Sequence, residues 1–211
     1  MGITERRERE KEQRRNDIID AAERIFFSKG WSTATMDDIA EEAELSKGTL
    51  YLYFKSKNEL YQAINLRGLL VLEKLFQEAV NRYETGIEKT RAIGQAYYQF
   101  YLDYPDYFNA LVYFESHEID DADENSVATE CDDQGNKVLN LLIEALQKGI
   151  EDGTIRSDIN PLKTAVILWG YSSGLIQLIS SKGEHLQREH GLIIDELMNY
   201  AFELIHYFLK H

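Results

Sequence analysis

Apolar residues recur along this chain every three or four positions, a spacing that places them on one face of an α-helix. The first such stripe contains Ile18, Ala22, Ile25 and Phe26. Strict alternation of apolar and polar residues, which would indicate a half-buried β-strand, does not continue over a useful length. The pattern therefore predicts an all-α protein with about nine helices.

Capping residues indicate where these helices begin and end. Gly30 follows the first stripe, Thr35 and Ser46 precede two short helices, and Asn160 stands before Pro161. Residues 115–133 hold nine Asp and Glu and no Lys or Arg, and we expect this acidic segment to be a loop. The expected helices lie near residues 15–29, 36–43, 47–54, 57–83, 87–104, 105–117, 134–151, 161–182 and 187–209.

The two short helices form either a plain helical hairpin or a helix-turn-helix that enters the major groove of DNA. Ala40 is small where the helices would cross, Leu45 follows the turn, and Leu50 comes five residues later. Rotation by 100° per residue puts Leu50 and Phe54 on the buried side of the second helix. This spacing favours the helix-turn-helix.

The opposite side of that helix carries residues suited to reading DNA. Leu52 offers methyl groups to thymine, and the Thr49 hydroxyl can meet a base edge or a phosphate. Nearby tyrosines and lysines reach phosphates, which fix the register of a complex, and Thr35 with the free N–H groups of the preceding helix is expected to hold another. The predicted DNA-binding set is Thr35, Ser46, Lys47, Gly48, Thr49, Tyr51, Leu52, Tyr53 and Lys57.

Residues 21–64 read AAERIFFSKGWSTATMDDIAEEAELSKGTLYLYFKSKNELYQAI. This stretch resembles the DNA-binding domain of the tetracycline-repressor (TetR) family of transcriptional regulators, through its F.SKGW..AT link, its DIAEEAELSKGTLYLYF core and its KSKNEL helix start. The resemblance implies a helix-turn-helix domain at residues 1–60, with a charged leader at 1–14, and an effector-binding and dimerisation domain at 61–211. Glu44 departs from the family, which often has glycine in the turn, and a non-glycine residue there costs some strain.

Charge is distributed unevenly along a chain whose net charge is −14. Residues 1–57 carry 11 Lys and Arg against 12 Asp and Glu, whereas the remainder carries 12 against 25. The first part can therefore meet a polyanion, and the acidic remainder favours solubility. The leader sequence ERREREKEQRR, at residues 5–15, is either a solvated helix with i, i+4 ion pairs or an arm that adds phosphate or minor-groove contacts.

The last two expected helices are apolar over too wide an arc for helices that bury a single face. Gly170 and Gly174 lie one turn apart, and small residues permit close helix approach. In the family that residues 21–64 resemble, two such helices pair with their copies in a four-helix dimer interface. The competing interpretation buries both helices within one subunit. The predicted interface residues are Gly170, Gly174, Leu178, Leu197, Ala201 and Ile205.

Nine aromatic residues gather between Tyr97 and Phe114. Such residues usually fill a core, but tyrosine hydroxyls need partners, and a pocket for a small, mostly apolar effector combines both properties. Tyrosine faces would also favour an organic cation. The predicted effector-binding set is Tyr98, Tyr101, Tyr113, Phe114, Leu142, Trp169 and Ser173.

Other chemistry finds little support in the sequence. Cys131 is the only cysteine, which excludes an internal disulfide and fits a cytoplasmic protein. The charged N-terminus is not a signal peptide, and the apolar run at residues 166–179 is too short to span a bilayer. Because no phosphate-binding glycine loop, nucleophile elbow or metal-ligand spacing is found, no enzymatic activity, cofactor or metal is predicted. The acidic segment 115–133 is interpreted as solvated, and whether it binds a cation stays open.

The sequence thus favours a cytoplasmic homodimeric regulator, more a repressor than an activator, that binds a palindromic operator in double-stranded DNA and is released by a small, mostly apolar effector. Two alternatives come from other classes. The first is a DNA-bound structural or cell-division protein on the same fold without an effector. The second is an enzyme that uses the aromatic pocket, which would require an acid or base with a perturbed pKa.

Overall fold

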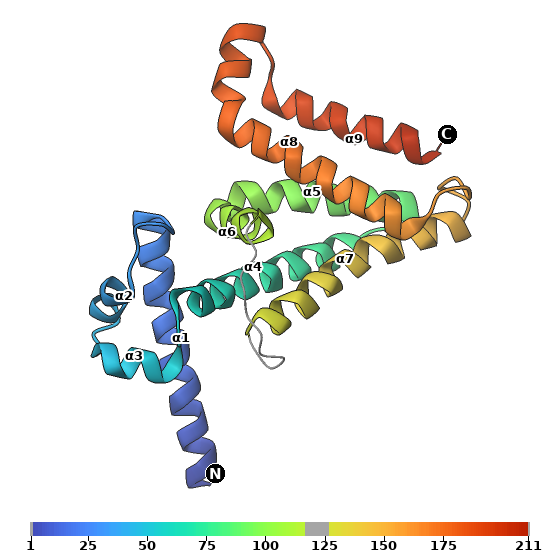
Figure 1. Ribbon diagram of the computed structural model, residues 1–211. Helices are drawn as coiled ribbons and strands as arrows, with labels where there is room; N and C mark the ends of the chain where they lie inside the picture. Colours follow the sequence, from blue (N-terminus) through green and yellow to red (C-terminus); the bar gives the residue numbers. More distant parts are fainter. Residues whose placement is uncertain (1, 117–126, 211) are drawn as a thin grey trace. The chain divides into compact units, whose positions relative to one another are not determined.

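The computed structural model describes residues 2–116 and 127–210. Within these ranges the chain forms nine helices and no strand, which confirms the predicted all-α fold (Figure 1). The helices are α1 (Ile3–Lys29), α2 (Met36–Glu42), α3 (Lys47–Tyr53), α4 (Lys57–Val80), α5 (Gly86–Asp103), α6 (Pro105–Ser116), α7 (Val127–Glu151), α8 (Pro161–His190) and α9 (Ile194–Lys210).

The chain divides into two compact units. Unit 1 comprises residues 1–68 and 109–132, and unit 2 comprises residues 69–108 and 133–211. The helix-turn-helix therefore shares its unit with residues 61–68 and with a segment far along the chain. A boundary drawn at residue 60 from the sequence does not include these additions.

Unit 1 is built on the apolar stripe of α1, the end of α3 and the start of α4. Ile18, Leu50 and Phe54 are fully buried, as the helical spacing predicts. An aromatic cluster extends this core: the Trp31 ring lies 4.2 Å from Tyr61 and 5.8 Å from Tyr113, measured between centroids. The Tyr61 hydroxyl donates to the Ala110 carbonyl at 2.6 Å, and burial raises the Tyr61 pKa. This bond ties Ala110, in the second segment of unit 1, to the first half of α4.

Unit 2 packs α5, α8 and α9 with the later part of α7 around Phe100, Phe108 and Leu146, all nearly fully buried. Its tightest crossing brings the start of α5 against α7, where a Cβ on Gly86 would lie 1.9 Å from the Gly149 nitrogen. Only glycine permits that approach.

The structure corrects several helix boundaries. The acidic segment is not a loop throughout, because α7 begins at Val127; residues 117–126, with the candidate cation ligands His117, Glu118, Asp120, Asp121 and Asp123, lie outside the described residues. The first turns of α7 are held by a buried stripe at helical spacing. This stripe escaped prediction because half of its members are not strongly apolar: Val127, Cys131, Gln134 and Val138.

The end of α8 also differs from the expectation. This helix continues to His190, and the left-handed Gly191 (φ 64°) ends it. Gly183, which follows the predicted end, is buried inside the helix, where a Cβ would lie 3.7 Å from Ile194. At 30 residues α8 is long and apolar enough to cross a membrane by length and composition alone, which revises the judgement that its apolar run is too short. A helix packed in a soluble protein passes the same test.

Candidate functional sites

The helix α3 presents an outward face whose position follows from its capping and burial. Ser46 caps α3 by accepting a hydrogen bond from the Thr49 amide at 3.1 Å. Leu50 and Phe54 point into the core, so the opposite side faces solvent, and there Leu52 is 75% exposed. A single exposed leucine is ordinary on a protein surface, so the significance of Leu52 depends on the residues beside it.

The neighbours of Leu52 complete this face. Gly48 is open to solvent, with only the Ser46 hydroxyl within 4 Å of a Cβ placed there. Tyr51 is exposed, and Tyr53 is half-buried. The Thr49 hydroxyl lies 2.8 Å from the Ser46 hydroxyl. These residues share one exposed surface of α3, as the rotation argument predicts.

The turn between α2 and α3 contains the one non-glycine residue with positive φ among the described residues. Glu44 has φ 54°, the left-handed conformation that favours glycine. The turn is closed by a bond from the Leu45 amide to the Ala40 carbonyl at 2.9 Å. The strain expected at Glu44 from the sequence is therefore present.

Most cations of the helix-turn-helix are paired within the chain. Lys47 lies 2.6 Å from Asp37, which raises the pKa of the lysine. Lys29 lies 2.8 Å from Asp38, and hydrogen bonds from Lys29 and Thr35 lower the pKa of Asp38 to about 2. Asp38 thus accepts hydrogen bonds from the amide and the hydroxyl of Thr35, the residue that the sequence assigned to a phosphate together with the free N–H groups of α2.

Lys57 has a structural contact that sequence reasoning missed. Its ammonium donates to the carbonyls of Trp31 at 2.8 Å and Ala34 at 3.1 Å, and it lies 4.7 Å from the Trp31 ring centroid. These bonds hold the loop between α1 and α2 against the start of α4. A phosphate contact from Lys57 stays a prediction, and it would compete with these bonds.

Helices α8 and α9 expose an apolar face on unit 2. Gly170 and Gly174 have open space where a side chain would stand, and Leu178 on the same helix is exposed. Ala201 is only 3% exposed and faces the interior, so it is removed from the predicted interface, whereas Leu197 and Ile205 are half-buried. The large exposed apolar residues on these two helices include Leu162, Val166, Ile167, Leu178, Tyr200, Leu204, Tyr207 and Phe208.

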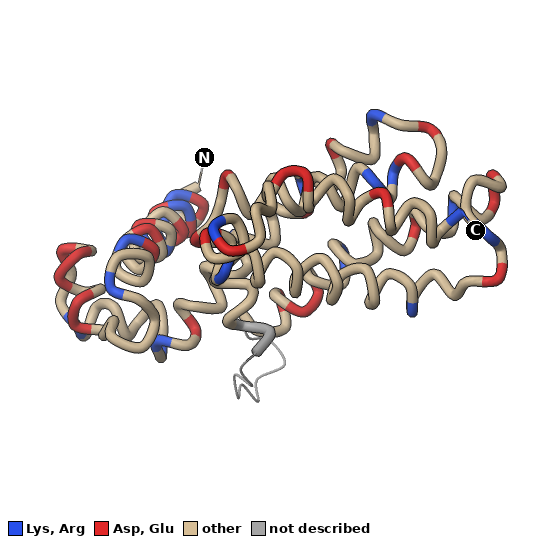
Figure 2. The backbone as a smooth tube through the Cα atoms, turned by 90° about the horizontal axis from the view of Figure 1, so that it is seen from above, with Lys and Arg blue, Asp and Glu red and all other residues tan. Residues whose placement is uncertain are grey.

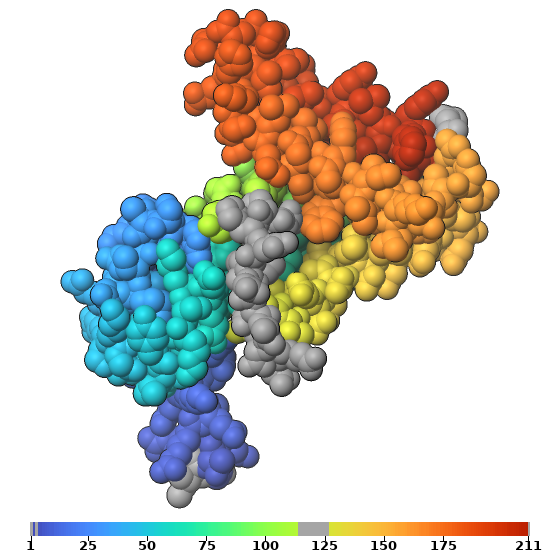
Figure 3. Space-filling model, viewed as in Figure 1, coloured from blue at the N-terminus to red at the C-terminus, as the bar shows by residue number. Residues whose placement is uncertain are grey.

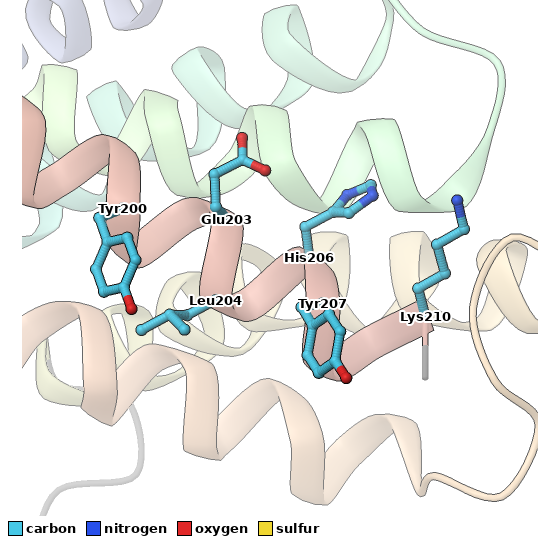
Figure 4. Close-up of a pocket in the computed structure, with 6 residues that line it drawn as sticks. All are labelled: Tyr200, Glu203, Leu204, His206, Tyr207 and Lys210. Atoms are coloured by element: carbon cyan, nitrogen blue, oxygen red, sulfur yellow. The ribbon is translucent and has the colours of Figure 1, made fainter.

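The α9 part of this face forms a hollow lined by Tyr200, Glu203, Leu204, His206, Tyr207 and Lys210. Figure 4 shows Tyr200, Leu204 and Tyr207 on one side of the helix, with Glu203 and His206 on the other. The three apolar side chains recur at i, i+4 and i+7, the spacing of a helix-packing seam. We call the exposed apolar surface of α8 and α9 the α8–α9 face.

The residues predicted to bind an effector fall in different surroundings. Tyr98, Tyr101, Leu142 and Ser173 lie in unit 2. Tyr98 and Tyr101 stack with ring centroids 6.1 Å apart. The Ser173 hydroxyl lies 2.8 Å from the Tyr97 hydroxyl, and Leu142 is buried. Tyr113 packs against Tyr61 in unit 1, and the Phe114 side chain lies outside the described residues. Trp169 is 40% exposed beside the α8–α9 face. It therefore does not line an enclosed cavity, and its assignment to the effector pocket is corrected.

Two buried amides in unit 1 were not identified from the sequence. Gln62 is 0% and Asn65 1% exposed, yet both amide heavy atoms of Gln62 and the Asn65 oxygen have no hydrogen-bond partner in the protein. They lie one turn apart on α4 beside Cys131. The Cys131 thiol donates to the backbone carbonyl of Gln62, and burial raises the pKa of this thiol to about 12. Buried amides without partners are costly, and such groups are suited to a polar ligand atom. No sequence signal distinguishes them from the other polar residues of α4.

Comparison with known proteins assigns two parts of the chain to family profiles. Residues 18–64 match the profile described as "Bacterial regulatory proteins, tetR family", and residues 90–199 match "Tetracyclin repressor-like, C-terminal domain". The transcriptional activator FasR of Mycolicibacterium smegmatis is 33% identical over 90 residues, 43% of this chain and 41% of FasR. The repressor KstR2 of Rhodococcus jostii is 29% identical over 150 residues, 71% of this chain and 72% of KstR2.

The chain thus spans less than half the length of FasR, and 29% of the length of the regulator YfiR of Bacillus subtilis. Solved structures share its fold. FadR of Bacillus subtilis in complex with stearoyl-CoA superposes with a TM-score of 0.71 at 18% identity, covering 91% of this chain and 97% of FadR. AibR in complex with isovaleryl coenzyme A and operator DNA gives 0.66 at 18% identity, covering 90% and 97%.

Proposed function

We propose that this protein, which belongs to the TetR family of bacterial regulatory proteins, is a homodimeric repressor that a small effector releases from a palindromic operator. The observation that carries DNA reading is the face of α3, where Leu52 stands open between anchored ends of a capped helix. In a dimer, two copies of α3 would enter successive major grooves about 34 Å apart. The relatives include an activator and a repressor, so repression rather than activation is itself part of the proposal.

Dimerisation is proposed through the α8–α9 face. Open glycines at 170 and 174 and a seam of exposed tyrosine and leucine side chains on α9 support it. Large exposed apolar residues that gather on one part of a soluble protein often mark an interaction surface. Gly174→Arg should give a monomer that has lost tight operator binding. Gly135→Arg is the matched control, because Gly135 also lies in a helix with open space around it.

Effector binding is proposed for a ligand with an apolar body and a polar head. The unpartnered amide of Gln62 offers a donor and an acceptor for the head, and the unpartnered oxygen of Asn65 offers a second acceptor. Two proteins of the same fold were solved with acyl-CoA ligands, stearoyl-CoA in FadR and isovaleryl coenzyme A in AibR, which combine an acyl chain with polar groups. The alternative, a DNA-bound structural protein without an effector, does not explain why these buried amide atoms have no hydrogen-bond partner in the protein.

Selection of bound sequences from random duplexes tests the proposal. We expect a motif with dyad symmetry, and Leu52→Ala should change the preferred base at one symmetric pair of positions. Leu102→Ala is the control, since Leu102 is an exposed leucine on α5. Selection that returns no dyad motif would refute operator binding. A dyad motif whose base preference does not respond to Leu52→Ala would remove α3 as the reader.

A further inference from the structure

The leader is part of α1 and continues the register of the buried stripe. The helix begins at Ile3, so residues 3–14 are helical and extend beyond the packed helices of unit 1 (Figure 3). Arg7, Lys11 and Arg14 precede Ile18 at spacings of four, three and four residues. The same side of α1 therefore carries apolar residues where the helix packs against the core and basic residues where the helix extends beyond it. We call Arg7, Lys11 and Arg14 the leader row.

The direction of the leader row is fixed by the next cation on the same side. The guanidinium of Arg15 lies 5.1 Å from the ring centroid of Phe54, the residue that ends α3. The side of α1 that carries the row therefore continues the side that packs against the end of α3. Figure 1 shows the first turns of α1 extending past α3 within unit 1.

Many other cations of unit 1 have a partner within the chain, and the leader row does not. Lys29, Lys47 and Arg24 form ion pairs with carboxylates, and Lys57 is bound to two carbonyls. On the leader itself, Arg6 pairs with Glu10 at 2.8 Å, and Arg9 donates to a backbone carbonyl. Within the described residues, no ion pair or side-chain hydrogen bond involves the row. Figure 2 shows Lys and Arg interspersed with Asp and Glu along the N-terminal helix.

We propose that the leader row binds the phosphate backbone of the DNA that flanks the site read by α3. Phosphate contacts by Lys and Arg supply sequence-independent affinity through counterion release. Residues 3–14 extend about 18 Å at 1.5 Å per residue, which corresponds to about five base pairs along the duplex at 3.4 Å each. This inference rests on DNA binding but not on an operator, because phosphates carry no sequence information.

Two single substitutions on the leader form a matched test. Lys11→Gln removes one charge from the row, and Arg9→Gln removes one charge from the other side of the helix; glutamine is a good helix former. The probe is a random-sequence 40-base-pair duplex, and the binding constant is measured between 50 and 200 mM salt. In a dimer Lys11→Gln should lower the slope of log K against log[salt] by about 2, at about 0.9 per lost phosphate contact. Arg9→Gln should leave the slope nearly unchanged.

Duplex length provides the second measurement. On the motif recovered by selection, Lys11→Gln should weaken binding at least tenfold when the flanks are present and little when they are trimmed to the motif. Equal losses for Lys11→Gln and Arg9→Gln, or none for either, would overturn the proposal. If selection finds no motif, operator binding fails, yet the random duplex still shows whether the row contacts phosphates.

Discussion

Replacing Gln62 by methionine should make this protein more stable. Gln62 is fully buried on α4, and neither its amide nitrogen nor its oxygen has a hydrogen-bond partner within the protein. Methionine has a similar length and no group that must be desolvated without compensation. The substitution therefore removes a cost of the folded state while nearly preserving packing.

The size of the effect follows from the free energy lost when a buried polar group forms no hydrogen bond. A buried polar group without a partner costs about 1–3 kcal/mol. For a chain of this length each kcal/mol shifts the melting temperature by about 2–4 °C, so Gln62→Met should raise it by about 2–12 °C. The same variant should lose the response to an effector whose polar head uses that amide, because stability and ligand recognition place opposite demands on residue 62.

Gln134 provides the matched control. It is equally buried, but its amide donates to the Glu73 carboxylate at 2.5 Å. Gln134→Met should lower the melting temperature, since a hydrogen bond to a charged group contributes about 1.5–3 kcal/mol. Thermal unfolding followed by circular dichroism compares both variants with the parent. If Gln62→Met is as destabilising as Gln134→Met, the Gln62 amide is hydrogen-bonded in solution, and the ligand argument built on it fails.

Three further predictions concern unit 1. Glu44→Gly should stabilise the protein by about 1 kcal/mol, visible as a higher melting temperature, because φ 54° strains a side chain but not glycine; a lower value would refute this. Lys57→Met should lower the melting temperature and weaken binding to all duplexes alike, since the loop held at Trp31 and Ala34 would be released; a change in base preference would contradict this. Because the pKa of Asp38 is lowered to about 2, its stabilising contribution is complete above about pH 4. It should be lost as the pH falls towards 2, and Asp38→Asn should remove this part of the acid transition measured by circular dichroism.

The sequence predicted the all-α fold and the orientation of α3 because both depend on local periodicity. Leu50 and Phe54 lie one turn apart, so their burial places Leu52 outside whatever the helix packs against. The start of α7 was missed for a physical reason: Cys131 and Gln134 complete its buried stripe, and neither is a strong hydrophobic signal. Gly183 shows the reverse case, since a glycine that looks like a helix end serves close packing against Ile194.

Site residues that act through tertiary contacts could not be predicted in this way. Lys57 follows a turn and resembles a phosphate ligand, but its ammonium finds two carbonyls 23 and 26 residues away. Trp169 lies in an apolar run that predicts burial, yet its side of α8 is left open. The unpartnered state of Gln62 depends on everything packed around it. Each case requires knowing which elements meet, and periodicity does not supply that.

The helix α4 places the buried amides next to the parts of unit 1 that hold the DNA-reading elements. Gln62 lies five residues from Lys57, about 7.5 Å along the helix, and follows Tyr61, whose hydroxyl binds Ala110. Lys57 and Trp31 in turn fix the loop that leads into α2. A ligand that bonds Gln62 better in a shifted position of α4 would stretch the Lys57 and Tyr61 contacts, and its differential affinity is the energy available to do so. A tenfold loss of DNA affinity requires about 1.4 kcal/mol of such coupling, which is within the range of one hydrogen bond to a neutral amide.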